Sequence, residues 1–412
     1  MIMSNTFGER TILHCDCNSY YASVESIDRP ELKDVPMAVC GDPDSRHGII
    51  LAKNEEAKKY GIKTAETIFS AKRKCPHLVL VPSHHEKYAY YCEKINTIYL
   101  DYTDQVERFS VDESWLDVTG SLHLYGTGKE IADEIRRRVR EEIGITVSVG
   151  VSFNKVFAKL GSDYKKPDAT TVISKENYKD ILFCLPVQDM LFVGKSAAKT
   201  LNSFGILTIG DIVKSGRETM SRLLGRAGES IWENASGLDM TPVKKYDEED
   251  GVKSVGNSIT FARNLVGKDD VHAGLTMLCD SVGARLRKQG LFCTTVQIQI
   301  RDPNFQTIQR QKTLNTATNS TRALFENALD IFKKCYSFNS PIRLLGVTAS
   351  GLTTHATVQM SLLDEGEEEA SEKNTRLDKT VDEIRSRFGK NTISFANTIR
   401  TDIVKENKND SE

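Results

Sequence analysis

Residues 106–118 read VERFSVDESWLDV, and this stretch does most to decide the fold of the first half of the chain. Two runs rich in strand-forming residues, Val106–Val111 and Trp115–Val118, flank the polar group Asp112-Glu113-Ser114. Valine, phenylalanine and tryptophan favour strands, whereas a short polar group between two such runs favours a turn. The pattern therefore predicts a β-hairpin that carries two neighbouring carboxylates at its tip.

The segments around this hairpin complete a small α/β unit. Thr11–Cys17 (TILHCDC) and Thr146–Ser152 (TVSVGVS) are short, apolar-rich and strand-like. Thr127 and Glu130 have the spacing of a capping box. Apolar residues then recur every fourth position and predict an amphipathic helix: Ile131, Ile135, Val139 and Ile143. The order strand, hairpin, helix, strand predicts a sheet covered by helices on one face, the ferredoxin-like class.

The remaining segments are predominantly helical, then mixed. Short helices are predicted at 54–60 and 67–74, and glycines punctuate a mostly helical stretch at 186–242. A charged segment without periodicity, 246–251, is typical of a linker. The expected elements after it are a helix at 271–289, a strand at 294–301, a helix at 320–335, a strand at 342–350 and a helix at 375–388.

The charge is unevenly distributed along the chain. The formal net charge is −2, but residues 251–351 hold 13 Lys and Arg against 6 Asp and Glu, and residues 364–412 hold 9 against 13. A positive segment is suited to a nucleic-acid backbone, although it is also compatible with an ordinary solvated basic face. The C-terminal tail is expected to be solvated and acidic.

The nine cysteines are odd in number, scattered, and never spaced CxxC. This usage predicts reduced cysteines and a cytoplasmic protein. Cys15 and Cys17 flank Asp16, but the absence of a nearby histidine partner makes thiolate ligation an unfavoured alternative. No apolar run of about 18 residues and no secretory signal pattern is present, so no membrane association is expected.

Three acidic residues are candidates for a metal site. Asp16 ends a predicted strand, and Asp112 and Glu113 lie in the predicted hairpin, so a shared sheet would bring them to one edge. Converging carboxylates repel each other unless a cation lies between them, and hard oxygen ligands select Mg²⁺ or Mn²⁺. Each acid alone is more simply a cap or a solvated turn residue.

Several longer motifs resemble the Y-family DNA polymerases, especially the DNA polymerase IV branch. ILHCDCNSYYASVE (12–25), SVDESWLDVT (110–119) and GVSFNKVFAKLGSDYKKP (150–167) resemble its three polymerase motifs, and KSVGNSITFAR (253–263) resembles the start of its DNA-gripping domain. The motifs occur in the family order, and the likeness extends over roughly residues 10–390.

The resemblance implies an α+β multidomain fold with a ferredoxin-like palm, small fingers, a helical thumb and a C-terminal α/β little-finger domain. The implied boundaries are a palm at 1–22 and 80–175, fingers at 23–79, a helix-hairpin-helix-like thumb at 176–243, a linker at 244–253, a little finger at 254–351 and an acidic tail at 352–412. It implies a monomeric, low-fidelity, template-directed DNA polymerase that tolerates damaged templates, because small fingers close weakly on the nascent base pair.

The resemblance also assigns roles to residues. Two Mg²⁺ ions, which Mn²⁺ can replace, would be held by Asp16, Asp112, Glu113 and the Cys17 carbonyl. Contacts to the incoming dNTP would come from Tyr20, Tyr21 as the steric gate against a ribose 2′-hydroxyl, Lys58 and Lys166. Contacts to primer–template DNA would come from Gly194, Lys253, Ser258, Thr260 and Arg263. A peptide at 359–363 resembles the motif that binds the sliding clamp (its beta subunit) through Gln359, Leu362 and Leu363.

Two segments depart from the family pattern. The fingers motif Tyr-x-Ala-Arg is replaced by Glu55-Glu56-Ala57-Lys58, which predicts weaker nucleotide binding because lysine lacks the planar fork of arginine. Gly-x-Gly in the thumb is replaced by Gly194-Lys195-Ser196. In the third motif Lys155, Lys159 and Lys166 would line one stripe if the helix were continuous.

Two other classes of protein remain as alternatives. A metal-dependent nucleotide cyclase also places carboxylates on a ferredoxin-like sheet, but it needs neither a basic domain nor a clamp-like peptide. A non-catalytic DNA- and clamp-binding factor would keep the fold, but it has no use for an intact set of acidic residues.

Overall fold

A computed structural model of the chain describes residues 10–41, 48–248, 251–355, 365–389, 392–399 and 402–403. The chain forms two compact units, Met1–Glu249 and Asp250–Glu412. Among the described residues, no helix is both long and apolar enough to cross a lipid bilayer.

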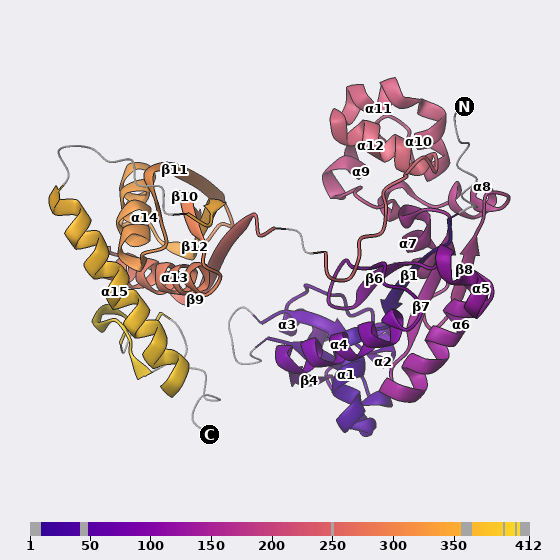
Figure 1. The fold of residues 1–412 in the computed structure, drawn as a ribbon, viewed down its shortest axis with the longest axis horizontal. Coiled ribbons are helices and arrows are strands. Elements are labelled where there is room, and N and C mark those ends of the chain that lie inside the picture. The colour runs from indigo at the N-terminus through magenta and orange to yellow at the C-terminus, as the bar shows by residue number, and fades with distance from the viewer. Residues whose placement is uncertain are drawn as a thin grey trace. The chain divides into compact units, whose positions relative to one another are not determined.

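A five-stranded sheet is the centre of the first unit (Figure 1). Its order is β5-β6-β1-β7-β8, with β7 and β8 parallel and the other pairs antiparallel. The strands are β5 (Val106–Arg108), β6 (Glu113–Asp117), β1 (Ile12–Cys17), β7 (Val147–Ser152) and β8 (Thr170–Ile173). The predicted hairpin is confirmed, but Glu113 is the first residue of β6 rather than part of the tip.

Helices cover both faces of this sheet, so the expectation of a single covered face was wrong. On one face Leu13 and Cys15 join a core with Ile131 of α6 (Gly128–Arg138). On the other face His14 is hydrogen-bonded to Ser162 of α7 (Lys155–Tyr164) at 2.8 Å. In the sequence, the small residues of TVSVGVS look like a solvated strand face. In the structure they let α7 pack closely on the strand, since a Cβ at Gly150 would lie 1.9 Å from a backbone oxygen of that helix.

Further helices and a second sheet surround this core. The three-stranded sheet β3-β2-β4, which the sequence did not predict, consists of β2 (Met37–Cys40), β3 (Ile50–Lys53) and β4 (Val79–Pro82). The other helices of this region are α1 (Tyr20–Asp28), α2 (Glu55–Lys59), α3 (Ile68–Lys74), α4 (His85–Leu100) and α5 (Leu122–Tyr125). The capping box of Thr127 and Glu130 is confirmed, and α6 continues into a π-helical turn at Val139–Ile143.

The predicted helical stretch after the sheet is confirmed. It contains α8 (Tyr178–Leu182), α9 (Lys195–Ser203), α10 (Ile209–Ser215), α11 (Arg217–Leu224) and α12 (Arg226–Ala235). Gly205 and Gly225 have φ angles of +75° and +64°, which side-chain-bearing residues rarely adopt, so they permit the turns between helices. These helices enclose a separate apolar core.

The second unit contains a four-stranded antiparallel sheet and several helices (Figure 1). Its strand order is β11-β10-β12-β9. The elements are β9 (Ser254–Leu265), α13 (Lys268–Lys288), β10 (Phe292–Arg301), β11 (Thr307–Thr318), α14 (Thr321–Cys335) and β12 (Ile342–Thr353). The sequence missed β9 and β11 as strands. β11 is a mostly exposed edge strand and carries polar residues where a half-buried strand would alternate.

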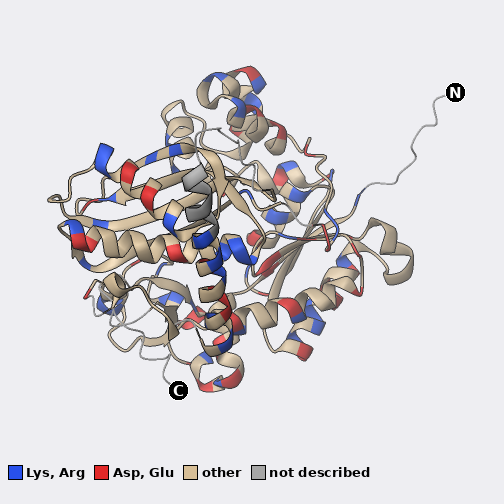
Figure 2. Ribbon diagram, turned by 60° about the vertical axis from the view of Figure 1, so that its left-hand side comes forward, with Lys and Arg blue, Asp and Glu red and all other residues tan. Residues whose placement is uncertain are grey.

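The C-terminal segment packs back onto the second unit, which corrects the expectation of a solvated tail. The helix α15 (Glu365–Phe388) begins ten residues before the expected start. The sequence did not predict this first part because residues 365–374 lack an apolar period. Lysine and arginine alternate with acidic residues along its described part (Figure 2). Arg287 of α13 is bound to Asp382 of α15 at 2.6 Å, and Ile403 is fully buried in the core of the unit. Acidic residues thus serve as intramolecular partners.

Candidate active site

A cavity of about 490 Å³ in the first unit brings together most of the residues expected to bind metal and nucleotide. One wall comes from β1, the following turn and the hairpin, and another comes from β3 and α2. The lining includes all three candidate carboxylates and three lysines: Asp16, Asp112, Glu113, Lys53, Lys58 and Lys166.

The strand register fixes the carboxylate wall. Asp16 and Glu113 are paired across β1 and β6, so their side chains leave the same face of the sheet. The Cys17 N–H donates to the Asp112 carbonyl at 3.0 Å and ties the hairpin loop to the end of β1. Ser110 Oγ donates to Asp112 Oδ1 at 2.6 Å and orients that carboxylate.

Lysines neutralise two of the three carboxylates. Lys166 Nζ lies 2.6 Å from Asp16 Oδ2, and Lys159 Nζ lies 2.7 Å from Glu113 Oε2. Across the residues that the structure describes, no three His, Cys, Asp or Glu side chains are gathered closely enough to form a ready metal site. The three acids therefore share a cavity, but Asp16 and Glu113 are paired with lysines and Asp112 is bonded to Ser110.

The expected stripe of three lysines on one continuous helix was wrong. The helix α7 ends at Tyr164, two residues before Lys166, because a residue that precedes proline is disfavoured in helical conformation. Lys166 reaches Asp16 from the segment after the helix, whereas Lys155 and Lys159 remain on α7.

Burial shifts the pKa values of the acids. Desolvation raises the pKa of Asp16 to about 7, against the opposing effect of Lys166, and it also raises the pKa of Asp112. Desolvation acts in the same direction on Glu113, but the adjacent His14 ring and the Lys159 ammonium outweigh it and hold the Glu113 pKa below its usual range. Asp16 and Asp112 are thus acids that their own surroundings do not fully compensate.

The chemistry of these donors fits hard divalent cations. The carboxylates supply oxygen ligands of the kind that Mg²⁺ and Mn²⁺ prefer. The Cys17 thiol is unsuited to be a ligand, since burial and then the Asp112 and Asp16 charges hold its pKa well above the usual range.

The two expected aromatic residues of the nucleotide site differ in exposure. Tyr20 is buried, and its hydroxyl donates to the Tyr88 carbonyl at 2.7 Å. Tyr21 is half-buried and stacks on Tyr88, with ring centroids 4.0 Å apart and planes 12° from parallel. Burial and the Asp112 charge raise the pKa of Tyr21. Tyr20 is among the residues that line the carboxylate cavity, whereas Tyr21 is not.

The expected DNA contacts are differently placed. Gly194 is exposed at the N-cap of α9, and Lys253 and Ser258 are exposed at the start of β9. Thr260 is half-buried on the same strand. Arg263 is engaged by Asp270 and Asp402, with contacts of 2.5 Å and 2.7 Å. Gln359, Leu362 and Leu363 lie outside the described residues.

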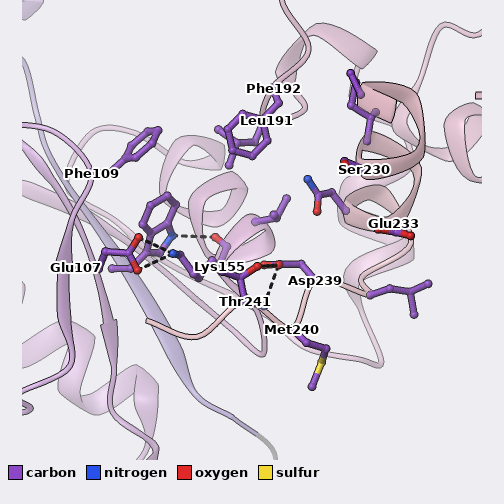
Figure 3. A pocket seen from close by; sticks show the side chains of 16 residues that line it. Glu107, Phe109, Lys155, Leu191, Phe192, Ser230, Glu233, Asp239, Met240 and Thr241 are labelled. Carbon is purple, nitrogen blue, oxygen red and sulfur yellow. Dashed lines mark hydrogen bonds and ion pairs between the residues drawn. The ribbon is translucent and has the colours of Figure 1, made fainter. Parts of the chain in front are cut away.

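A second cavity, of about 900 Å³, lies between the hairpin, α7 and α12 (Figure 3). Lys155 and Glu107 point toward each other there, with a closest contact of 2.6 Å, and the Lys155 ammonium lies 4.5 Å from the Trp115 ring centroid (Figure 3). Lys155 therefore has a structural partner and does not line the carboxylate cavity.

Sequence reasoning missed several residues that organise the site. His14 is fully buried behind Glu113, with its Nε2 atom 3.6 Å from Glu113 Oε2, and burial lowers its pKa to about 4. The Asn18 amide donates to Ser148 and accepts from the backbone N–H of Asp168, thereby linking β1 to β7 and to the Lys166 segment. A polar residue within a buried strand was the available signal for His14.

The fold is that of the Y-family DNA polymerases. A solved Y-family DNA polymerase chimera of Dbh and Dpo4 superposes with a TM-score of 0.73 at 22% identity, over 84% of this chain and 100% of the chimera. Models of the impB/mucB/samB family match residues 15–163, and models of that family's C-terminal domain match residues 252–362.

Curated relatives define the family more narrowly. DNA polymerase IV of Acetivibrio thermocellus is 47% identical over 382 residues, which cover 92% of this chain and 95% of the relative. DNA polymerase IV of Clostridium acetobutylicum is 35% identical over 390 residues, which cover 93% and 97%. The chain belongs to the DNA polymerase IV family, and the resemblance in its motifs is confirmed.

Proposed function

We propose that the chain is a template-directed DNA polymerase that adds dNTPs to a primer 3′-hydroxyl with low fidelity and takes part in translesion synthesis. The observation that carries the proposal is the cavity that Asp16, Asp112 and Glu113 line together with three lysines, Lys53, Lys58 and Lys166. Anionic substrate phosphates and metal-binding carboxylates need opposite charges within one site, and this cavity supplies both.

The carboxylates are the proposed metal ligands, together with the Cys17 carbonyl. Two Mg²⁺ ions, or Mn²⁺ in their place, supply the chemistry of lowering the pKa of the primer hydroxyl and neutralising the leaving pyrophosphate. Without bound metal, Lys166 neutralises the charge of Asp16 and Lys159 neutralises that of Glu113. The two acids are thereby held in place without mutual repulsion.

Lys166 and Tyr21 are proposed to bind and select the nucleotide. Lys166 moves from Asp16 toward the triphosphate once Asp16 has another cation partner. Tyr21 is held rigid by its stack on Tyr88, so its ring excludes a ribose 2′-hydroxyl and favours deoxynucleotides.

Primer–template DNA is the proposed partner of Gly194 and of β9 through Lys253, Ser258, Thr260 and Arg263. Hydroxyl and lysine groups on an edge strand suit phosphate contacts that position DNA without reading its sequence. Arg263 has to leave Asp402 to reach a phosphate. The peptide 359–363 is proposed to bind the sliding clamp, and the enzyme is proposed to act as a cytoplasmic monomer.

Neither alternative is favoured by a specific observation. The chain covers 95% of a DNA polymerase IV relative, including the C-terminal domain that a cyclase does not need. A non-catalytic factor would not require the three acids to line one cavity.

Single-nucleotide extension of a labelled primer on four templates that differ only in the templating base tests the proposal. We expect the complementary dNTP to be added in the presence of Mg²⁺ or Mn²⁺ and no addition with EDTA. DNA binding without extension would indicate the non-catalytic factor, and template-independent consumption of one nucleoside triphosphate would indicate the cyclase.

A further inference from the structure

The wall of the cavity that β3 and α2 supply departs most from the family pattern. It is formed by Lys53 at the end of β3 and by Glu55 and Lys58 on α2. Asn54 fixes this wall: its amide nitrogen donates to the Leu32 and Val35 carbonyls at 2.9 and 2.7 Å, and its Oδ1 atom accepts from the backbone N–H groups of Met37 and Ala57 at 3.1 and 2.9 Å. Lys53 and Glu55, on either side of Asn54, therefore project from a backbone that these hydrogen bonds hold rigid.

The Glu55 carboxylate lies in the cavity where a hydroxyl and an ammonium group converge on it. Its Oε1 atom accepts from Ser19 Oγ at 3.1 Å and lies 2.5 Å from Lys58 Nζ. Ser19 belongs to the turn between β1 and α1, the segment whose N–H groups are proposed to face the triphosphate. A hydroxyl and an ammonium that converge on one carboxylate oxygen would serve a phosphate oxygen equally well.

Lys53 is a second cation on this wall, with a different partner. Its Nζ atom donates to the neutral Thr64 Oγ1 at 2.8 Å, and it forms no ion pair with any residue in the described part of the chain. Burial and then the neighbouring Lys58 charge lower the pKa of Lys53, against the smaller opposing effects of Glu55 and Glu66. An ammonium that lies near another ammonium and forms no ion pair in the described part of the chain gains from an added anion.

We propose that Lys53 contacts a phosphate of the incoming nucleotide, and that Glu55 holds the position of a second phosphate oxygen until the nucleotide displaces it. The inference rests on the proposed polymerase function and names a nucleotide-binding residue that the family motif does not provide. Lys53 and Lys58 together then replace the Tyr and Arg of the usual fingers motif, and Glu55 lowers nucleotide affinity by competing for Lys58 and Ser19.

Steady-state single-nucleotide insertion with each of the four dNTPs tests the inference, with KM and kcat measured separately. Loss of a charge-assisted phosphate contact should raise KM about tenfold in Lys53→Met, with kcat changed by less than about twofold. Lys53→Arg, which keeps the charge, should restore most of the affinity. Glu55→Gln, which weakens the competing acid, should lower KM about threefold.

Lys59→Met is the matched control, because Lys59 lies on the same short helix, outside the cavity, and pairs with Glu56 at 2.6 Å. Its KM should equal that of the wild type. Melting temperatures of all variants, measured in parallel, separate nucleotide binding from folding.

Three results would overturn the inference: an unchanged KM in Lys53→Met, a rise in KM for one dNTP only, which would indicate a base contact, or a rise that Lys53→Arg does not reverse. These results presuppose extension by the wild type. Failure of the wild type to extend any primer would instead contradict the proposed function.

Discussion

The two units each hold an aspartate against a cation, yet the environments of the two pairs act in opposite directions. In the first unit Asp16 lies 2.6 Å from Lys166, but burial dominates and raises the pKa of Asp16 to about 7. In the second unit Asp270 forms a bidentate ion pair with the Arg263 guanidinium, and the hydrogen bonds of this pair hold the pKa of Asp270 below its usual range.

The contrast separates a site prepared for a ligand from a structural contact. Desolvation of Asp16 exceeds the compensation that one lysine gives, so an added divalent cation stabilises the carboxylate. Asp270 receives a two-pronged arginine contact and a backbone N–H from Val266 at 2.9 Å, so it needs no further partner. A short distance between opposite charges alone does not distinguish the two cases.

Replacement of Asp16 should have the largest effect. Asp16→Asn removes a proposed metal ligand, and we expect primer extension to fall by about a thousandfold or more. Its melting temperature should not fall, because the variant also removes a poorly compensated buried charge. Asp270 holds Arg263, a proposed DNA contact, so Asp270→Asn is the matched control for the chemical step and should extend at the wild-type rate when DNA is saturating. Retention of extension within tenfold by Asp16→Asn would break the comparison.

The second largest effect is expected on the free energy of unfolding, when the contact between α13 and α15 is disrupted. The side chain of Arg287 is 7% exposed and is bound to Asp378 and Asp382. Arg287→Met leaves these acids without their partner, and we expect the free energy of unfolding to fall by about 3 kcal/mol. Urea denaturation measures it, with Arg322→Met, whose surface pair with Glu326 is exposed, as the control. Equal stability of the two variants would show that the tail is not part of the folded unit.

Replacement of the stacked tyrosine should alter sugar selection by a smaller factor. Tyr21→Ala removes the ring that is proposed to face the sugar, and we expect discrimination against ribonucleotides to fall about thirtyfold, since steric exclusion is the proposed basis of selection. The ratio of kcat/KM for dNTP and rNTP measures this effect. Tyr90→Ala, an exposed tyrosine of α4, should leave the ratio unchanged.

The pH dependence of stability should show the smallest effect. A carboxylate whose pKa is lowered by folding contributes stability above its unfolded pKa near 3.8 and loses this contribution as pH falls through the folded value. At pH 6 the free energy of unfolding of the wild type should exceed that of Asp270→Asn by about 1 kcal/mol. This difference is modest because Arg263 is partly exposed. Thermal melts from pH 6 to pH 2.5 should show the difference shrinking; a constant difference would remove Asp270 titration as its cause.

The sequence motifs predicted which residues share a cavity more completely than the patterns predicted the fold. Asp16, Asp112, Glu113, Lys58 and Lys166 line one cavity, as their motifs implied. The covered second face of the sheet could not be predicted, because Ser148 and Gly150 look like a solvated strand face until a helix is placed against them. Strand β11 was missed because an edge strand need not bury apolar residues.

Pairing between charges was the other feature that the sequence left open. The net charge of the segments suggested a basic DNA-binding face and a solvated acidic tail. The structure instead joins Arg263 to Asp402 and Arg287 to Asp382. Such contacts depend on how the chain folds back, which residue counts do not specify.

The measurement that tests the central claim most directly is primer extension by wild type, Asp112→Asn/Glu113→Gln and Asp270→Asn, with DNA affinity measured for each. At saturating DNA the account predicts Mg²⁺-dependent extension by wild type and Asp270→Asn and none by the double variant, whose DNA affinity should equal that of the wild type. Extension by the double variant at the wild-type rate would contradict the assignment of these carboxylates to metal-assisted nucleotide transfer.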